Sequence, residues 1–113
     1  TKMGARMAAQ NTNTKQEIHM KNKALNIIFY NAISVNGVEH ETIPSERMVL
    51  ACIMLNLAEV DGEPFICTQP EIADSIGVEA KAVGRAVRKL VGIGAVDAAK
   101  KKNGWHYYGV NVA

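Results

Sequence analysis

The sequence predicts one small, mainly α-helical domain with a β-hairpin near its carboxyl end. The chain has 113 residues, 48% of them apolar, which suits a single domain with its own core. A helix-start signal at Thr68 and a helix-stop signal at Gly77 delimit a short helix, and a second amphipathic pattern follows directly. Two apolar stretches then flank a turn at Asn103-Gly104, as expected for a hairpin.

The first third of the chain divides into a tail and a helical segment. Residues 1–17 are rich in Asn, Gln, Thr, Ala and Lys without an apolar period, so we expect a flexible tail. Residues 18–44 are expected to hold an N-terminal helix and a connection. Apolar residues recur at helical spacing from Ala24 to Ile33, and Asn36-Gly37 can end that helix. A hairpin that turns at Asn36-Gly37 is the alternative, but the spacing favours the helix.

Residues 46–59 predict a longer helix, with Ser45 as its N-cap. The stretch from Met48 to Ala58 is apolar nearly all round, so this helix needs cover on more than one side. One side can face the domain core. The other needs either the preceding helix or a second subunit, and burial within the chain is favoured over a dimer.

The next signals describe a strand and a short helix. Phe65-Ile66-Cys67 is a strand candidate. Thr68 and Glu71 have the spacing of a capping box, in which each side chain bonds to the backbone amide of the other residue. The helix runs from Gln69 to Ile76 and ends at Gly77, because glycine accepts the left-handed conformation.

A second short helix is predicted from about Glu79 to Gly92. Its buried side is a stripe of small and aliphatic residues, and the small Ala73 lets the preceding helix lie close against it. The stripe consists of Ala82, Val83, Ala86, Val87 and Leu90. The outward side consists of Glu79, Ala80, Lys81, Gly84, Arg85, Arg88 and Lys89.

A hairpin closes the predicted fold. Ala95–Lys100 and Trp105–Val112 are strand candidates, and the segment Lys101-Lys102-Asn103-Gly104 between them suits a tight turn. Alternation along the second strand places Trp105 and Tyr107 on one face and His106 and Tyr108 on the other, and we expect one of these two faces to pack in the core. Lysines therefore gather at the tip of the hairpin.

Charge is unevenly distributed although the net charge is only +2. Residues 39–74 hold eight acids and one base, for a net charge of −7. Residues 75–113 hold seven bases and two acids, for a net charge of +5. A basic segment beside an acidic one hints at a surface that faces a polyanion. An ordinary mixed surface is the alternative, and charge alone leaves both open.

Several function classes find no support in the sequence. No apolar run reaches the ~18–20 residues of a membrane helix, and no signal-peptide pattern opens the chain. His19, His40 and His106 lack the spacing of metal ligands, so neither a metal nor another cofactor is expected. Ser45 and Ser75 lack a flanking nucleophile motif, so no enzyme is expected.

The two cysteines bear on the compartment. Cys52 and Cys67 both lie in apolar stretches, where buried thiols are favoured over a disulfide or a metal site. Buried thiols fit a reducing environment. We therefore expect a cytoplasmic protein, associated with the nucleoid if it is bacterial.

Two short helices joined at Gly77-Val78 and followed by a basic hairpin form a winged helix-turn-helix, here with an extra N-terminal helix. The segment from Thr68 to Leu90, followed by Gly94-Ala95-Val96, resembles the helix-turn-helix of bacterial winged-helix transcription regulators. It is equally similar to the origin-binding domains of phage and plasmid replication proteins. The resemblance spans about Ser45 to Val112, so residues 45–113 are predicted to form the winged-helix domain.

The resemblance implies a DNA-binding role for the second short helix, whose first turns would face base edges in the major groove. The start of the first short helix, the later turns of the second and the hairpin would contact phosphates. The chain departs from the family at Glu79 and Ala80, where relatives often have Ser or Thr followed by Arg, and at Gly84, where a polar base-reading residue is common. The predicted DNA-binding residues are Thr68, Gln69, Ala80, Lys81, Arg85, Arg88, Lys89, Lys100, Lys101 and Lys102.

These patterns predict a sequence-selective, double-stranded DNA-binding protein that acts in transcription regulation or replication initiation. A homodimer and a protein partner are further expectations. The alternative is a protein-interaction module that docks a partner through the apolar helix at 46–59. A third possibility is binding of RNA or single-stranded DNA through an exposed aromatic of the hairpin. The basic outward face favours duplex DNA over both.

Overall fold

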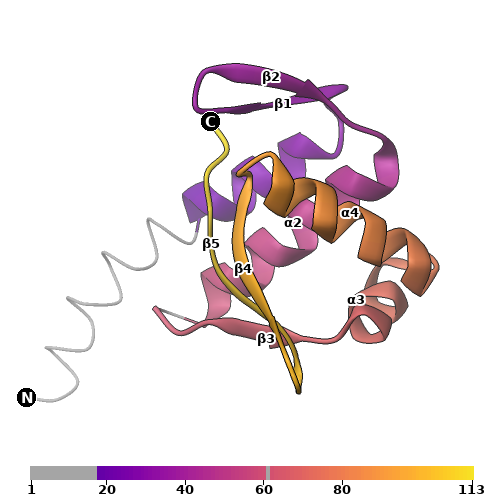
Figure 1. The fold of residues 1–113 in the computed structure, drawn as a ribbon. Helices are drawn as coiled ribbons and strands as arrows, with labels where there is room; N and C mark the ends of the chain where they lie inside the picture. Colours follow the sequence, from indigo (N-terminus) through magenta and orange to yellow (C-terminus); the bar gives the residue numbers. More distant parts are fainter. Residues whose placement is uncertain (1–17, 61) are drawn as a thin grey trace, which may run out of the picture.

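The computed structural model describes residues 18–60 and 62–113, so the predicted tail at 1–17 lies outside the described residues. Figure 1 shows helices and two small antiparallel sheets arranged as one mixed α/β domain. The helices are the N-terminal helix (residues 18–27), α2 (Pro44–Glu59), α3 (Gln69–Ile76) and α4 (Ala80–Gly92). The strands are β1 (Ala32–Val35), β2 (Val38–Glu41), β3 (Phe65–Cys67), β4 (Val96–Lys101) and β5 (Gly104–Val110).

The larger sheet has three antiparallel strands in the order β3-β5-β4. Phe65 pairs with Tyr107, and Lys101 pairs with Gly104 beside the turn. Tyr107 is fully buried and stacks between Phe65 and Trp105, at ring-centroid distances of 5.6 Å and 6.3 Å. The predicted strands are therefore confirmed, and the structure identifies the face with Trp105 and Tyr107 as the core face. With a second sheet present as well, the prediction of a mainly α fold with one small hairpin was too narrow.

The second sheet corrects the reading of the N-terminal third. The N-terminal helix ends at residue 27, and β1 and β2 form the hairpin that was the alternative. Asn36 and Gly37 both have positive φ, at 51° and 80°, as a two-residue hairpin turn that follows the twist of its strands requires. Ile33 and Val35 are buried alternately, with the period of a strand. The predicted helix through Ile33 is wrong.

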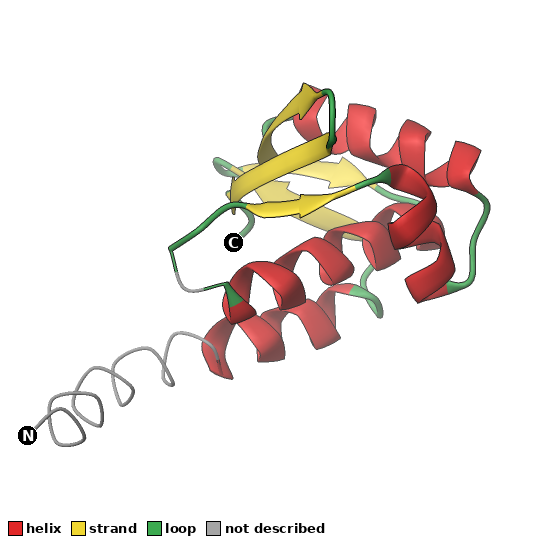
Figure 2. Cartoon of the chain, turned by 90° about the horizontal axis from the view of Figure 1, so that it is seen from below, coloured by secondary structure: helices red, strands yellow, loops and turns green. Residues whose placement is uncertain are grey.

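α2 lies at the centre of the domain, as Figure 2 shows from below. It begins at Pro44 with Ile43 as its N-cap, so the predicted cap at Ser45 is wrong. Proline suits the first helical position because it needs no amide partner there. The Ile43 amide donates to Oε1 of Glu46 at 3.0 Å, which satisfies one of the free donors of the first turn.

The apolar side chains of α2 are covered within the chain. α3, α4, β3 and β5 contact this helix, and Leu50, Ile53 and Met54 are fully buried. The N-terminal helix adds the buried Ala24 and Ile27 to the same core. Burial within the chain, the favoured expectation, is confirmed for these residues, whereas the dimer stays a prediction.

Candidate nucleic-acid interface

The start of α3 is held by the predicted capping box. Oγ1 of Thr68 accepts from the Glu71 amide at 3.3 Å, and Oε1 of Glu71 accepts from the Thr68 amide at 2.9 Å. The bond from the Thr68 amide, and after it a hydrogen bond from the Thr68 side chain, lower the pKa of the Glu71 carboxyl.

The turn between α3 and α4 is also as predicted. Gly77 has a φ of 72° and donates to the Ala73 carbonyl at 2.9 Å. This left-handed residue ends α3 and redirects the chain into α4 without the steric cost that a Cβ would add. Ala73 is buried, and α3 packs against α4. The relative positions of the two helices are thus defined by local signals and small side chains.

α4 separates its apolar and basic residues cleanly. Val83, Val87 and Leu90 are fully buried. Lys81, Arg85 and Arg88 are exposed on the opposite side. Their spacing of four and three residues aligns them along one face of the helix. In the described part of the chain, no carboxylate pairs with any of the three.

Gly84 does not belong to the outward face. It is buried beneath the Gln69 side chain, and a Cβ at this position would lie 2.9 Å from Oε1 of Gln69. Gln69 therefore lies across α4 and joins the contact between the two helices. Ala80 is half-buried and packs against the core. The prediction that Gly84 faces outward is wrong. α3 packs across α4 at this position and covers the glycine with the Gln69 side chain.

Lys89 is tied to other parts of the domain. Its Nζ lies 2.9 Å from Oε1 of Glu46 and donates to the Glu41 carbonyl at 2.8 Å. It connects the end of α4 to α2 and β2, and so differs from the other cations predicted for this face. Nearby, buried Arg47 donates to the Thr42 carbonyl at 2.6 Å. Lys89 and Arg47 therefore both make contacts within the domain that link separate segments of the chain.

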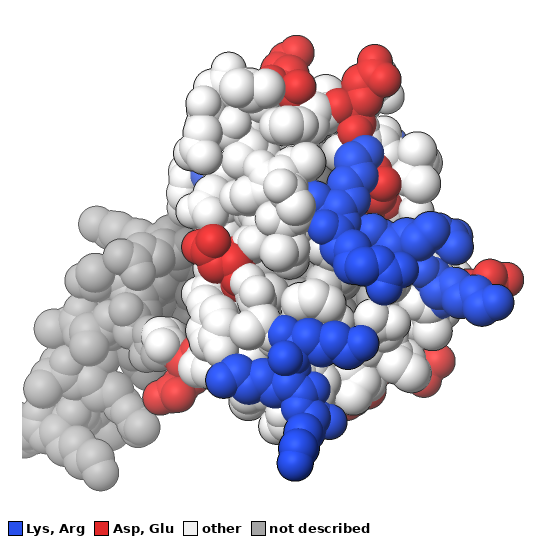
Figure 3. Space-filling model, viewed as in Figure 1, with Lys and Arg blue, Asp and Glu red and all other residues white. Residues whose placement is uncertain are grey.

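The lysines Lys100, Lys101 and Lys102 are exposed at the end of the β4–β5 hairpin. His106 supports this turn, with Nε2 2.8 Å from Oδ1 of Asn103. Figure 3 shows two groups of Lys and Arg side chains on one face, one over α4 and one at the hairpin tip, with uncharged surface between them. The structure thus brings together cations that lie far apart in the sequence.

Gly104 positions the hairpin, a role that sequence reasoning missed. It has a φ of 121°, and a Cβ here would lie 2.8 Å from the Cys67 carbonyl oxygen and 3.3 Å from Cγ2 of Thr68. The tip of the hairpin therefore approaches the start of α3 through a position with no side chain. Its only sequence signal was the Asn-Gly pair, which indicated a turn and no close approach.

Other kinds of site find no support in the described residues. Between residues 18 and 113, position 61 aside, no three His, Cys, Asp or Glu side chains are grouped to hold a metal ion. None of the helices in this part of the chain is both long and apolar enough to cross a membrane. Comparisons of the sequence with protein-family models and with curated proteins find no match.

Proposed function

We propose that this chain is a winged helix-turn-helix protein that binds double-stranded DNA through α4 and the β4–β5 hairpin. The order of elements supports this proposal: α3 and α4 are joined by a tight turn, and the hairpin that follows pairs with β3. α2 packs behind both helices and gives them a rigid support.

The observation that carries the proposal is the shared exposure of two groups of cations on one face. Lys81, Arg85 and Arg88 are exposed on α4, and the lysines at 100–102 are exposed at the hairpin tip. Figure 3 shows Lys and Arg side chains over both elements on one face of the domain. A phosphate backbone provides a continuous line of negative charge, and binding releases its condensed counterions. Six exposed cations in two groups suit a ligand that carries charge along its length.

The dimensions of α4 fit the major groove. Its 13 residues span about 20 Å. The groove is about 12 Å wide and admits an α-helix. In this pose Arg85 would lie along the base edges, the start of α3 at Thr68 and Gln69 would face a phosphate, and the hairpin lysines would follow the neighbouring backbone. We place such a protein in transcription regulation or replication initiation, and a dimer would read two half-sites.

Salt dependence of binding tests the proposal. Fluorescence anisotropy with a labelled random duplex should give a slope of log affinity against log salt of roughly −4 to −5 if about five cations meet phosphates. Lys101→Ala/Lys102→Ala should flatten this slope by nearly two, whereas Lys81→Ala/Arg85→Ala, at positions placed along the base edges, should weaken binding with a smaller change in slope. Lys23→Gln, on the N-terminal helix, is the matched control. A salt-independent affinity, or tighter binding of single strands than of duplex, would contradict the proposal.

A further inference from the structure

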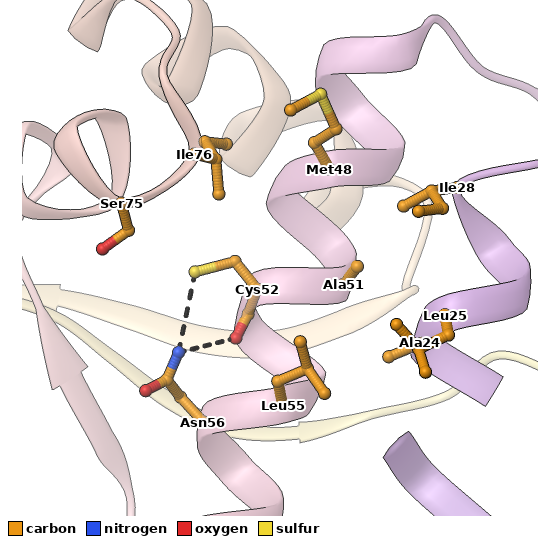
Figure 4. A pocket seen from close by; sticks show the side chains of 10 residues that line it. All are labelled: Ala24, Leu25, Ile28, Met48, Ala51, Cys52, Leu55, Asn56, Ser75 and Ile76. Carbon is orange, nitrogen blue, oxygen red and sulfur yellow. Dashed lines mark hydrogen bonds between the residues drawn. The ribbon is translucent and has the colours of Figure 1, made fainter. Parts of the chain in front are cut away.

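A pocket of roughly 370 Å³ lies between the N-terminal helix, α2 and the end of α3. Figure 4 shows Ala24, Leu25 and Ile28 on one side of it, and Cys52, Asn56 and Ser75 on the other. The side chains come from three separate helical segments, so the tertiary fold creates this space. None of the six cations of the proposed DNA-binding face lines it.

One side of the pocket carries hydrogen-bonding groups that the fold holds in place. Nδ2 of Asn56 donates to the Cys52 carbonyl at 2.8 Å and lies 3.6 Å from Sγ of the same residue. In the described structure, no donor reaches Oδ1 of Asn56. The Ser75 hydroxyl donates to the Glu71 carbonyl at 3.1 Å, and its oxygen keeps a lone pair for a further donor. Both side chains therefore offer acceptors at one edge of the pocket.

The remaining lining is apolar and uncharged. Met48, Leu55 and Ile76 complete it, and no lysine, arginine, aspartate or glutamate is among the lining residues. Burial raises the pKa of the Cys52 thiol, which is therefore neutral near pH 7. An ion would enter without a countercharge, at a large desolvation cost. The lining thus selects for an uncharged occupant.

We propose that this pocket binds a small, uncharged, largely apolar molecule that carries one hydrogen-bond donor. The volume falls within the range of about 300–1,000 Å³ that is typical of small-molecule sites. Leu25 and Ile28 of the lining are exposed, so a second copy of the chain is the competing occupant, and the experiment below distinguishes the two. The apolar wall would hold the body of the ligand, and Oδ1 of Asn56 would accept from its donor.

The probe for this site is 2-naphthol, which is apolar, uncharged at pH 7 and has one hydroxyl donor. Titration into the ¹⁵N-labelled full chain should give saturable amide shifts around Cys52, Asn56 and Ser75, with a Kd of roughly 10 μM to 1 mM. Its methyl ether, which lacks the donor, should bind about three- to tenfold more weakly. The 2-naphthoate anion should bind at least about tenfold more weakly than 2-naphthol.

Two variants identify the site. Ser75→Trp adds bulk at the edge of the pocket and should weaken 2-naphthol binding at least about tenfold, whereas Asp74→Trp, one residue away and outside the lining, should leave it unchanged. Asn56→Leu removes an acceptor and should reduce the preference for 2-naphthol over its methyl ether. If Ser75→Trp does not give a native NMR spectrum, the Asn56→Leu result decides whether the probe binds in this pocket.

Several results would overturn the inference. The titration with 2-naphthol could give no saturable amide shifts, or shifts only in other parts of the chain. The 2-naphthoate anion could bind more tightly than 2-naphthol, or 2-naphthol could bind equally well to the wild type and to a folded Ser75→Trp variant. Shifts of the same amides that depend on protein concentration without a probe would assign the pocket to a second copy. No arm of this experiment uses DNA, so it can fail or succeed independently of the proposed function.

Discussion

Nζ of Lys89 in α4 lies 2.9 Å from Oε1 of Glu46 in α2, where the Glu46 side chain is only 11% exposed. This ion pair joins two helices whose paired residues are 43 positions apart in the sequence. Glu46 also accepts from the Ile43 amide at 3.0 Å, so one carboxylate serves both the start of α2 and the end of α4. The proposed DNA-binding helix is thereby tied to the centre of the domain.

Removal of the Lys89 charge should destabilise the domain, because Glu46 would keep a poorly solvated carboxylate without its cation. Lys89→Met is expected to lower the free energy of unfolding by about 1–2 kcal/mol, between the values for exposed and buried pairs. Urea denaturation measures this change. Lys100→Met, at an exposed lysine of the hairpin, should change stability by less than about 0.5 kcal/mol. Equal effects of the two substitutions would show that the ion pair contributes nothing.

The cations of α4 and of the hairpin should differ in what they contribute to DNA binding. Arg85→Ala should cost about 1–3 kcal/mol on a preferred sequence and less on a random duplex if Arg85 reads a base. Lys101→Ala should weaken binding to both duplexes alike and reduce the salt slope by about one. Anisotropy titrations on a selected and a random duplex compare them. Uniform losses from both variants would assign Arg85 to the phosphate backbone.

The close approach at Gly104 should not tolerate a side chain. Gly104→Ala would place a Cβ 2.8 Å from the Cys67 carbonyl oxygen at a φ of 121°, and should cost about 1–3 kcal/mol of stability. Gly92→Ala is the matched control, because a Cβ there meets no atom within 4 Å. Thermal melts compare the two variants. A Gly104→Ala protein as stable as Gly92→Ala would refute the proposed constraint on the hairpin.

Cys67 should react slowly with alkylating agents in the folded protein. Burial, with the nearby Glu71 carboxylate second, raises the pKa of its thiol from 9.0 to about 11. At pH 8 the thiolate fraction is then roughly a hundredfold below that of a free thiol. Iodoacetamide labelling followed by peptide mapping should show this protection in the native chain and its loss in denaturant. The native rate should keep rising about tenfold per pH unit up to pH 10. A plateau near pH 9 would contradict the raised pKa.

Features that depend on neighbouring residues were predictable from the sequence. The Thr68–Glu71 capping box and the left-handed Gly77 each close within four residues, and the structure confirms both. The exposure of Lys81 and Arg85 could be predicted from helical periodicity, because the apolar valines of α4 occupy one side of the helix and leave the opposite side to these cations. Most of the cationic face could therefore be predicted before its spatial arrangement was known.

The errors arose where one local pattern suits two structures. Over the short stretch around Ile33, the spacing of the apolar residues is compatible with a helix and with a strand. The hairpin is decided by contacts from elsewhere, among them the bridge between Val35 and Val112 at the far end of the chain. Likewise, Gly84 has the periodicity of an outward residue, and only the crossing of α3 places it under Gln69.

The amino-acid sequence by itself determined both ends of α3, the alternation along β5 and the clustering of bases in the last third of the chain, because these depend on residues within a few positions of each other. Only the tertiary structure decided that Lys89 is tied to Glu46, that the hairpin lysines share a face with α4, and that a pocket opens beside Asn56. Each of these requires the relative placement of elements distant in sequence, which is set by packing of the whole core.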